Sequence, residues 1–380
     1  MNITYRFFHA NSDVVYPIKR EREGIPTVYT QAENLGGSFK RILRGLPAHN
    51  VANFSPSIVK HNGKTYIAWR SQPEPFGFRH DMKYFYLNNQ PTDIYIGELA
   101  DDHTIVGTKK LRSKKHRLSY EDPRLFVGPD DNLYVQFVAS TYASRYDNRP
   151  DKLFNTPKVI VCLVNDSFEA VHAAIPPIGK NLVKGEAEKN WCFFSHKGQL
   201  NCLYATRPLT IERENDPTIT VDTAALDKVT HGSPTFNSLP PINLGYGHLI
   251  FYHWKHMAQE ASGKTFLLYH LGAYIVDRDF TKILYIDKNP LFTGSLNDHL
   301  IVWTDYAGNP VSDQPAVMLP FGAYIENTEL VMSLGINDAF MGIFRCPMQN
   351  ILGRMEKPDQ DFSSRSIVDH TNSEESSSKA

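Results

Sequence analysis

A short acidic segment carries the clearest chemical signal in this chain of 380 residues. It reads Tyr-Glu-Asp-Pro-Arg and places the carboxyl groups of Glu121 and Asp122 beside the guanidinium of Arg124, at the start of an apolar run. Burial and a second carboxylate favour the protonated form of a carboxyl group, whereas a guanidinium favours the ionised form. A carboxyl group balanced in this way can protonate a leaving glycosidic oxygen. A surface ion pair in a turn is the alternative on residue chemistry alone.

Three residues far apart in the chain, Lys189, Arg207 and His253, have the right chemistry for an anion site. Arginine makes bidentate contacts with phosphate and lysine supplies a point charge. They form one site only if the fold brings these separate segments together. Otherwise each side chain lies separately on the rim of the fold and pairs with a nearby acidic residue. Trp191 is a candidate to stack on a sugar ring or to fill the core.

Hairpins are the elements that must position these residues. Apolar runs separated by short turns occur at 61–70, 125–139, 192–207 and 322–335, with Lys197-Gly198 as the third turn and Glu326-Asn327 as the fourth. Such runs predict antiparallel strand pairs, and the aromatic content of 12% suits strands. Few segments keep the apolar spacing of an amphipathic helix.

The hairpins resemble one unit used five times. Each unit opens with a small or polar cluster, and the openings begin at Ser55, Glu121, Glu188, Gly232 and Val317. Five openings with about four strands each predict an all-β protein, a five-bladed β-propeller with an axial active-site pocket. An irregular β-sandwich is the alternative, but closure into a ring removes exposed sheet edges. A ring brings equivalent polar residues together, and these are Asn53, Arg70, Asp122, Lys189, Arg207, His253 and Asp338.

Three regions are predicted along the chain. Residues 1–50 form an N-terminal segment that wraps the first blade, 51–352 form the catalytic propeller, and 353–380 form a polar, serine-rich, flexible tail.

Composition excludes several classes of protein. A formal charge of -1 argues against a dedicated nucleic-acid binder, and no run approaches the ~18–20 apolar residues of a membrane helix. The first residues lack the apolar stretch of a signal peptide.

The four cysteines form no CxxC pair, so we expect reduced thiols in a cytoplasmic protein. A disulfide between Cys192 and Cys202 is the less favoured alternative. No metal site is expected, since no HExxH or Cys/His cluster is present.

Four motifs in order resemble glycoside hydrolase family 130, the β-mannoside phosphorylases and related hydrolases. They also resemble the allied β-1,2-mannosyltransferases of glycosyltransferase family 108. The motifs are SPSIVKHNGKTYIAWR, YEDPRLF, LIFYHW with the following YHLGAYIVDRDFTKILYIDKNPLF, and VMLPFGAYIENTELVMSLGINDAFMGI. The resemblance covers residues from about 50 to 350.

The resemblance implies a role for each matching residue. Asp122 would be the general acid, acting through a sugar hydroxyl while inorganic phosphate attacks the anomeric carbon with inversion. The glycosyl unit would be held by Asn53, Arg70, Glu121, Arg124 and Asp338. Phosphate, or the phosphate of a sugar donor, would be held by Lys189, Arg207 and His253. No cofactor is implied beyond that co-substrate.

The sequence leaves the reaction open. The third-blade segment EKNWCFF and the Ser55-Pro56 pair differ from the usual family pattern, on the side of the anion and acceptor. The alternatives are transfer from a nucleotide sugar or sugar phosphate, hydrolysis with Glu188 as base, and a carbohydrate-binding propeller without catalysis. The expected partners are an oligosaccharide and phosphate or a nucleotide sugar, and a homo-oligomer is left open.

Overall fold

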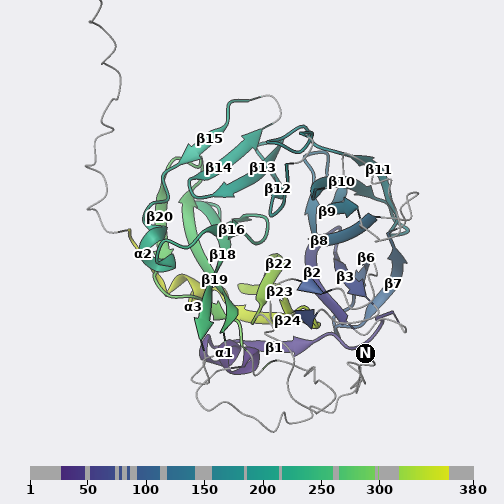
Figure 1. Cartoon of the computed structure of the whole chain (residues 1–380), viewed down its shortest axis with the longest axis horizontal. Coiled ribbons are helices and arrows are strands. Elements are labelled where there is room, and N and C mark those ends of the chain that lie inside the picture. Colours follow the sequence, from purple (N-terminus) through teal and green to yellow (C-terminus); the bar gives the residue numbers. More distant parts are fainter. Residues whose placement is uncertain are drawn as a thin grey trace, which may run out of the picture.

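The computed structural model describes residues 27–47, 52–72, 77–78, 84–85, 92–111, 118–141, 156–183, 186–213, 216–259, 265–295, 298 and 316–358. These residues are mostly strands, and their main sheets follow one another around a ring in chain order (Figure 1). The predicted all-β propeller arrangement is confirmed. The prediction of five blades is wrong: among the described residues four sheets are blades of four strands, and the remaining sheet is larger, with seven strands.

The first three blades contain most of the predicted hairpins. The first contains β2 (Ala52–His61), β3 (Lys64–Gln72), β6 (Asp93–Leu99) and β7 (Ile105–Lys110). The second contains β8 (Leu118–Val127), β9 (Leu133–Thr141), β10 (Lys158–Val164) and β11 (Ala170–Ala174). The third contains β12 (Cys192–His196), β13 (Gln199–Thr206), β14 (Leu209–Arg213) and β15 (Ile219–Val221). A separate pair is formed by β4 (Gly77–Phe78) and β5 (Tyr84–Phe85).

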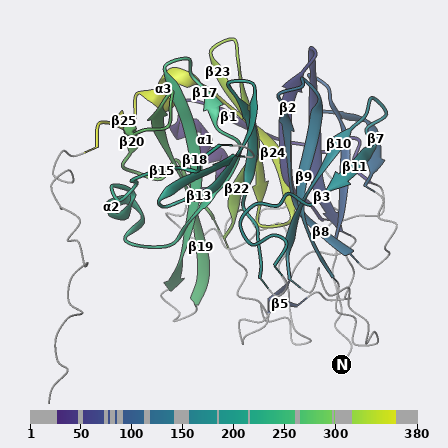
Figure 2. The same ribbon diagram turned by 90° about the horizontal axis from the view of Figure 1, so that it is seen from above.

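The seven-stranded sheet is built on one long hairpin. Its strands are β16 (Thr235–Asn237), β17 (Ile242–Asn243), β18 (Gly247–Gln259), β19 (Thr265–Asp277), β20 (Ile283–Asp287), β21 (Phe292–Thr293) and β25 (Met355–Glu356). β18 and β19 pair over their full length of 13 residues and run along the side of the ring (Figure 2). The short β17 and β21 pair with these two strands, and β25 pairs with β20, which explains why this sheet exceeds the predicted four strands.

The last blade joins the two ends of the ring. It contains β22 (Met318–Glu326), β23 (Glu329–Ile336), β24 (Phe340–Pro347) and, from the start of the described chain, β1 (Ser38–Arg41). β1 pairs antiparallel with β24, and Phe39 lies opposite Phe344. The three helices of the described chain are α1 (Val28–Asn34), α2 (Leu226–Thr230) and α3 (Met348–Leu352). None of these helices is long and apolar enough to cross a membrane.

Turn chemistry explains the hairpins. The Asn62-Gly63 and Lys197-Gly198 turns have positive φ at both residues, as two-residue type I′ hairpin turns require. The predicted Lys197-Gly198 turn is confirmed, whereas the turn predicted at Glu326-Asn327 lies one residue later, at Asn327 and Thr328. The predicted N-terminal segment includes β1, while residues 1–26 and 359–380 lie outside the described residues. The predicted domain boundaries therefore stay predictions.

The cysteines follow the register of the third blade. Cys192 lies opposite Leu203, and Cys202 lies opposite Phe193, so the two side chains are out of register by one residue. Adjacent residues of a strand face opposite sides of the sheet. Cys192 and Cys202 therefore pack in different core clusters, and all four thiols are free and buried.

Candidate active site

A cavity of about 300 Å³ lies among the strands of four sheets, and the segment just before β12 completes its wall. Ligand pockets in proteins begin at about this volume. The cavity brings together seven of the ten residues predicted for the site. These are Arg70, Glu121, Asp122, Arg124, Lys189, His253 and Asp338.

Two β-bulges aim side chains into the cavity. The register of β2 shifts between Phe54 and Ser57, and that of β8 shifts between Glu121 and Arg124. Each bulge contains a residue with positive φ followed by proline: Ser55 has φ 50° and Asp122 has φ 51°. A backbone in this conformation costs free energy for a residue other than glycine and is frequent at functional sites. The bulges explain how strands with buried faces present polar residues at one point.

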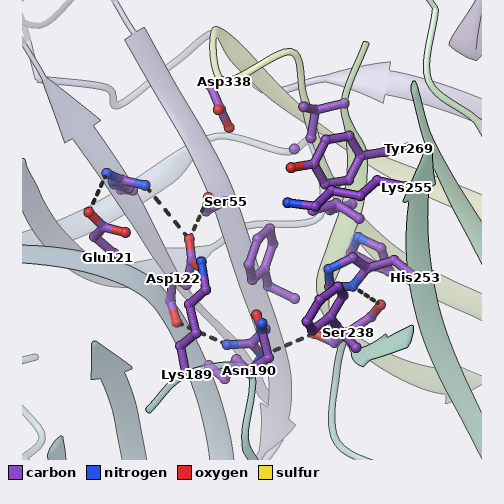
Figure 3. Close-up of a pocket in the computed structure, with 18 residues that line it drawn as sticks. Ser55, Glu121, Asp122, Lys189, Asn190, Ser238, His253, Lys255, Tyr269 and Asp338 are labelled. Carbon is purple, nitrogen blue, oxygen red and sulfur yellow. Dashed lines mark hydrogen bonds and ion pairs between the residues drawn. The ribbon is translucent and has the colours of Figure 1, made fainter. Parts of the chain in front are cut away.

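The carboxylates gather around one arginine. Arg70 Nη2 lies 3.2 Å from Glu121 Oε1, and Arg70 Nη1 lies 3.7 Å from Asp122 Oδ1 (Figure 3). The hydroxyl of Ser55 donates to the same Asp122 oxygen at 3.4 Å. Arg70 is itself buried and donates from Nε to Thr92 Oγ1 at 3.1 Å. These contacts fix the position of the Asp122 carboxyl group.

Asp338 is the third carboxyl group of the cavity, and it points inward from the turn between β23 and β24 (Figure 3). Its pKa is raised to about 6, first because burial disfavours its charged form. The Arg70 charge opposes this shift, whereas the charges of Asp122 and Glu121 add to it. Asp338 therefore changes charge near neutral pH, unlike an ordinary aspartate.

Two lysines also line the cavity. Lys189 enters from the segment before β12, and Lys255 enters from β18. Burial lowers the pKa of Lys255, and the charge of Lys189 lowers it further. Within the described residues neither lysine forms an ion pair. The positive charges of Lys189 and Lys255 therefore have no carboxylate partner there.

Arg124 adds a third positive charge. Its side chain is only 1% exposed, and its Nε donates to the Ser238 carbonyl at 3.0 Å. Its Nη1 donates to the Asp122 carbonyl at 3.4 Å, and its guanidinium lies 5.1 Å from the Phe321 ring centre. In the part of the chain that the structure covers, these partners are all neutral. A buried charge is costly unless an opposite charge is near, and Arg124 shares the cavity with three carboxyl groups and two lysines.

His253 is held as a neutral ring between aromatic side chains. Phe236 stacks on it at 5.4 Å between ring centres, and Tyr269 lies on it at 6.2 Å. The pKa of His253 is lowered to about 3, first by burial and then by the charges of Arg124, Lys189 and Lys255. A neutral imidazole can donate one hydrogen bond and accept one.

Three predicted residues do not line the cavity. Asn53 is buried and accepts hydrogen bonds from Trp69 Nε1 at 3.1 Å and Ser71 Oγ at 2.8 Å. Trp191 fills the core between Phe193 and Tyr204, as the alternative for it predicted.

Arg207 is the prediction that the structure corrects most clearly. Its guanidinium pairs with Asp227 of α2, outside the cavity lining. Arg207 lies in the short connection between β13 and β14. The position of Arg207 at the end of a predicted strand indicated the hairpin. It did not indicate which way the side chain of Arg207 points.

Lys255 is the functional candidate that the motifs missed. Residues two apart on a strand share a face, so a cavity-facing His253 places Lys255 on the same side. The register puts Phe236 opposite His253 and Tyr269 opposite Lys255, which completes a wall from three adjacent strands. Because alternate residues of a strand share a face, the prediction of His253 as a site residue could also have indicated Lys255.

Comparisons with known proteins agree with this fold. No protein-family model and no curated protein matches the chain. Solved structures do match, and one is the β-1,2-mannobiose phosphorylase from Listeria innocua. It is 16% identical, with 85% of this chain and 97% of that chain covered and a TM-score of 0.50.

Two other solved structures have the same architecture. One comes from work on family 130 mannoside phosphorylases and hydrolases that target β-1,2 mannosidic linkages in Candida mannan. It is 12% identical, covers 82% and 94% of the two chains, and has a TM-score of 0.51. The other is a GDP-mannose-dependent mannosyltransferase from Leishmania mexicana, 10% identical, covering 81% and 89%, with a TM-score of 0.50. This chain has the mannoside phosphorylase fold. The predicted resemblance is confirmed at that level.

Proposed function

We propose that the chain is a carbohydrate-active enzyme that transfers a mannosyl unit between a β-mannoside and inorganic phosphate, with inversion. One observation carries the proposal: a held carboxyl group, Asp122, shares a cavity with cations that have no carboxylate partner among the described residues. A sugar bound between them would meet an acid at its glycosidic oxygen and an anion at its anomeric carbon. The shared fold with a β-1,2-mannobiose phosphorylase supports the sugar class.

The proposed step balances as follows. Asp122 gives its proton to the leaving oxygen, and the bond from that oxygen to the anomeric carbon breaks. A phosphate oxygen forms the new bond from the opposite face, so a β-mannoside gives an α-mannosyl phosphate. Arg70, Glu121 and Asp338 hold the glycosyl unit. Phosphate is bound by Lys189, Lys255 and the ring N–H of His253, near the buried charge of Arg124. No cofactor takes part.

Hydrolysis is the weaker alternative because it needs a carboxylate base to activate water. Glu188 was the candidate, but it is buried and accepts hydrogen bonds from Trp191 Nε1 at 3.2 Å and Tyr204 Oη at 2.9 Å. It also accepts from the Lys180 backbone N–H at 2.8 Å. These contacts give Glu188 a structural role away from the cavity lining.

Transfer from GDP-mannose is the second candidate, favoured by the fold shared with the Leishmania mannosyltransferase. A donor screen separates the two. The protein is incubated with mannose 1-phosphate or GDP-mannose across a panel of mannoside acceptors, and release of phosphate or GDP is measured. The proposal predicts phosphate release from mannose 1-phosphate only, and loss of it in Asp122→Asn. Release of GDP alone would establish the transferase, and no release from either donor would leave carbohydrate binding without catalysis.

A further inference from the structure

Ser238 lies beside the cavity and is fixed from three directions. It follows β16 directly, is 1% exposed, and donates from its backbone N–H to the Phe251 carbonyl at 3.2 Å. Its own carbonyl accepts from Arg124 Nε at 3.0 Å. Its hydroxyl lies 3.0 Å from Nδ1 of His253 (Figure 3). The backbone cannot shift without breaking bonds to both neighbours, so the hydroxyl is a fixed partner for the imidazole.

The imidazole of His253 is fixed as well. Phe236 and Tyr269 lie along its faces, with interplanar angles of 29° and 28°. Because Nδ1 is bonded to Ser238, Nε2 is the nitrogen left to meet a ligand in the cavity. The part of the chain described here gives Nε2 no hydrogen-bond partner.

The two states of the cavity require opposite tautomers of this neutral ring. With the cavity empty, the nearby charges of Lys189 and Lys255 favour a lone pair on Nε2. With an anion bound, a hydrogen on Nε2 is favoured because it donates to the anion. The partner of Nδ1 must then accept in the first state and donate in the second.

A hydroxyl can do both, since serine has one donor and two acceptor lone pairs. A carbonyl or carboxylate in its place could only accept, and would keep the hydrogen on Nδ1. The Nε2 lone pair would then repel the anion. The choice of serine at this position therefore has a chemical consequence for the cavity.

We infer that Ser238 is a positioning residue whose hydroxyl holds Nδ1 of His253 in either tautomer, so that Nε2 presents a hydrogen to a phosphate group in the cavity. The ring stays neutral: one proton leaves Nδ1 and one is taken up on Nε2 through solvent. The inference rests on the proposed function, because that function supplies the phosphate.

The test combines nitrogen NMR with phosphate titration of the full chain. The ring nitrogens of ¹⁵N-labelled histidine report which nitrogen of His253 carries hydrogen, and His253→Gln assigns the signals. We expect addition of inorganic phosphate to shift the wild-type ring to the Nε2–H tautomer. In Ser238→Ala, phosphate affinity falls roughly fivefold to tenfold, the value of one hydrogen bond. Ser238→Thr keeps the hydroxyl and restores affinity, and Ser195→Ala, an exposed serine on β12, is the matched control.

Different results would contradict the role of Ser238 and the proposed function. A wild-type ring that keeps its hydrogen on Nδ1 with phosphate bound would overturn the role of Ser238 alone. So would an unchanged phosphate affinity in a folded Ser238→Ala protein. Absence of any binding of phosphate or mannose 1-phosphate by the wild type would contradict the proposed function itself. The wild-type spectrum gives this answer even if the alanine variant does not fold.

Discussion

At the scale of single residues, the two cavity lysines test the proposed phosphate site. Replacing Lys255 with Met keeps the length of the side chain and removes its charge. Hydrogen bonds to charged groups contribute about 1.5–3 kcal/mol, so phosphate affinity should fall by roughly 10–100-fold. Lys189→Met should have a similar effect, and Arg207→Ala should have little, because Arg207 pairs with Asp227. Calorimetry with phosphate measures all three, and a strong effect of Arg207 alone would restore the sequence-based assignment.

The raised pKa of Asp338 predicts a pH-dependent effect on stability. Between its ordinary value of 3.8 and about 6, the folded state binds more protons at this site than the unfolded state. Stability from this group therefore falls as pH rises through about 6. Asp338→Asn removes the charge and should raise the free energy of unfolding at pH 7.5 by at most about 3 kcal/mol. The gain should shrink toward pH 5, and denaturant unfolding at the two pH values checks it. A gain that is equal at both would show another cause.

The site was partly predictable because residue type and fold pattern agree at certain positions. The acid and the proline of Asp122-Pro123 mark an inner strand, and its partner Arg70 lies in the second strand of a predicted hairpin. Lys255 and Ser238 lie outside the motifs, and the pairing of β18 with β16 and β19 is what brings both to the cavity. Arg207 and Trp191 show the converse, since their chemistry fits the site but their side chains point elsewhere.

At the scale of elements, β1 closes the ring from the opposite end of the chain. Phe39 is buried in the core cluster between β24 and α1, whereas Lys40, the next residue, is exposed. Phe39→Ala should cost about 3–5 kcal/mol of unfolding free energy, as for other large core truncations. Lys40→Ala in the same strand should change it by no more than about 0.5 kcal/mol. Equal effects in thermal unfolding would mean that β1 does not pack as a buried strand.

The hairpins were the most predictable elements, since Asn62-Gly63 and Lys197-Gly198 have the turn chemistry that a tight hairpin needs. The pairing of β1 with β24 was not predictable, because Ser38–Arg41 is too short a pattern and its partner is about 300 residues away. The sheet of seven strands escaped prediction for a similar reason. Its extra strands β17, β21 and β25 have two residues each, too few to give a strand pattern in the sequence.

At the scale of the whole molecule, the ring makes one cavity from segments spread between β2 and the turn after β23. No single blade holds both an acid and a set of cations. The proposed function therefore depends on closure of the ring. The reaction depends on which co-substrate binds to Lys189, Lys255 and His253. A mannosyl unit attacked by phosphate, by water or by an acceptor sugar would give different products from the same scaffold.

The most direct test of the central claim is a cleavage reaction followed by ³¹P NMR. The protein is mixed with β-1,2-mannobiose and ¹⁸O-labelled phosphate, and the products are observed as they form. We expect α-mannose 1-phosphate with the label in the bond to the anomeric carbon. Its rate of formation should rise with the phosphate concentration and fall by ~10²–10⁴-fold in Asp122→Asn. Free mannose released at the same rate with and without phosphate would contradict it.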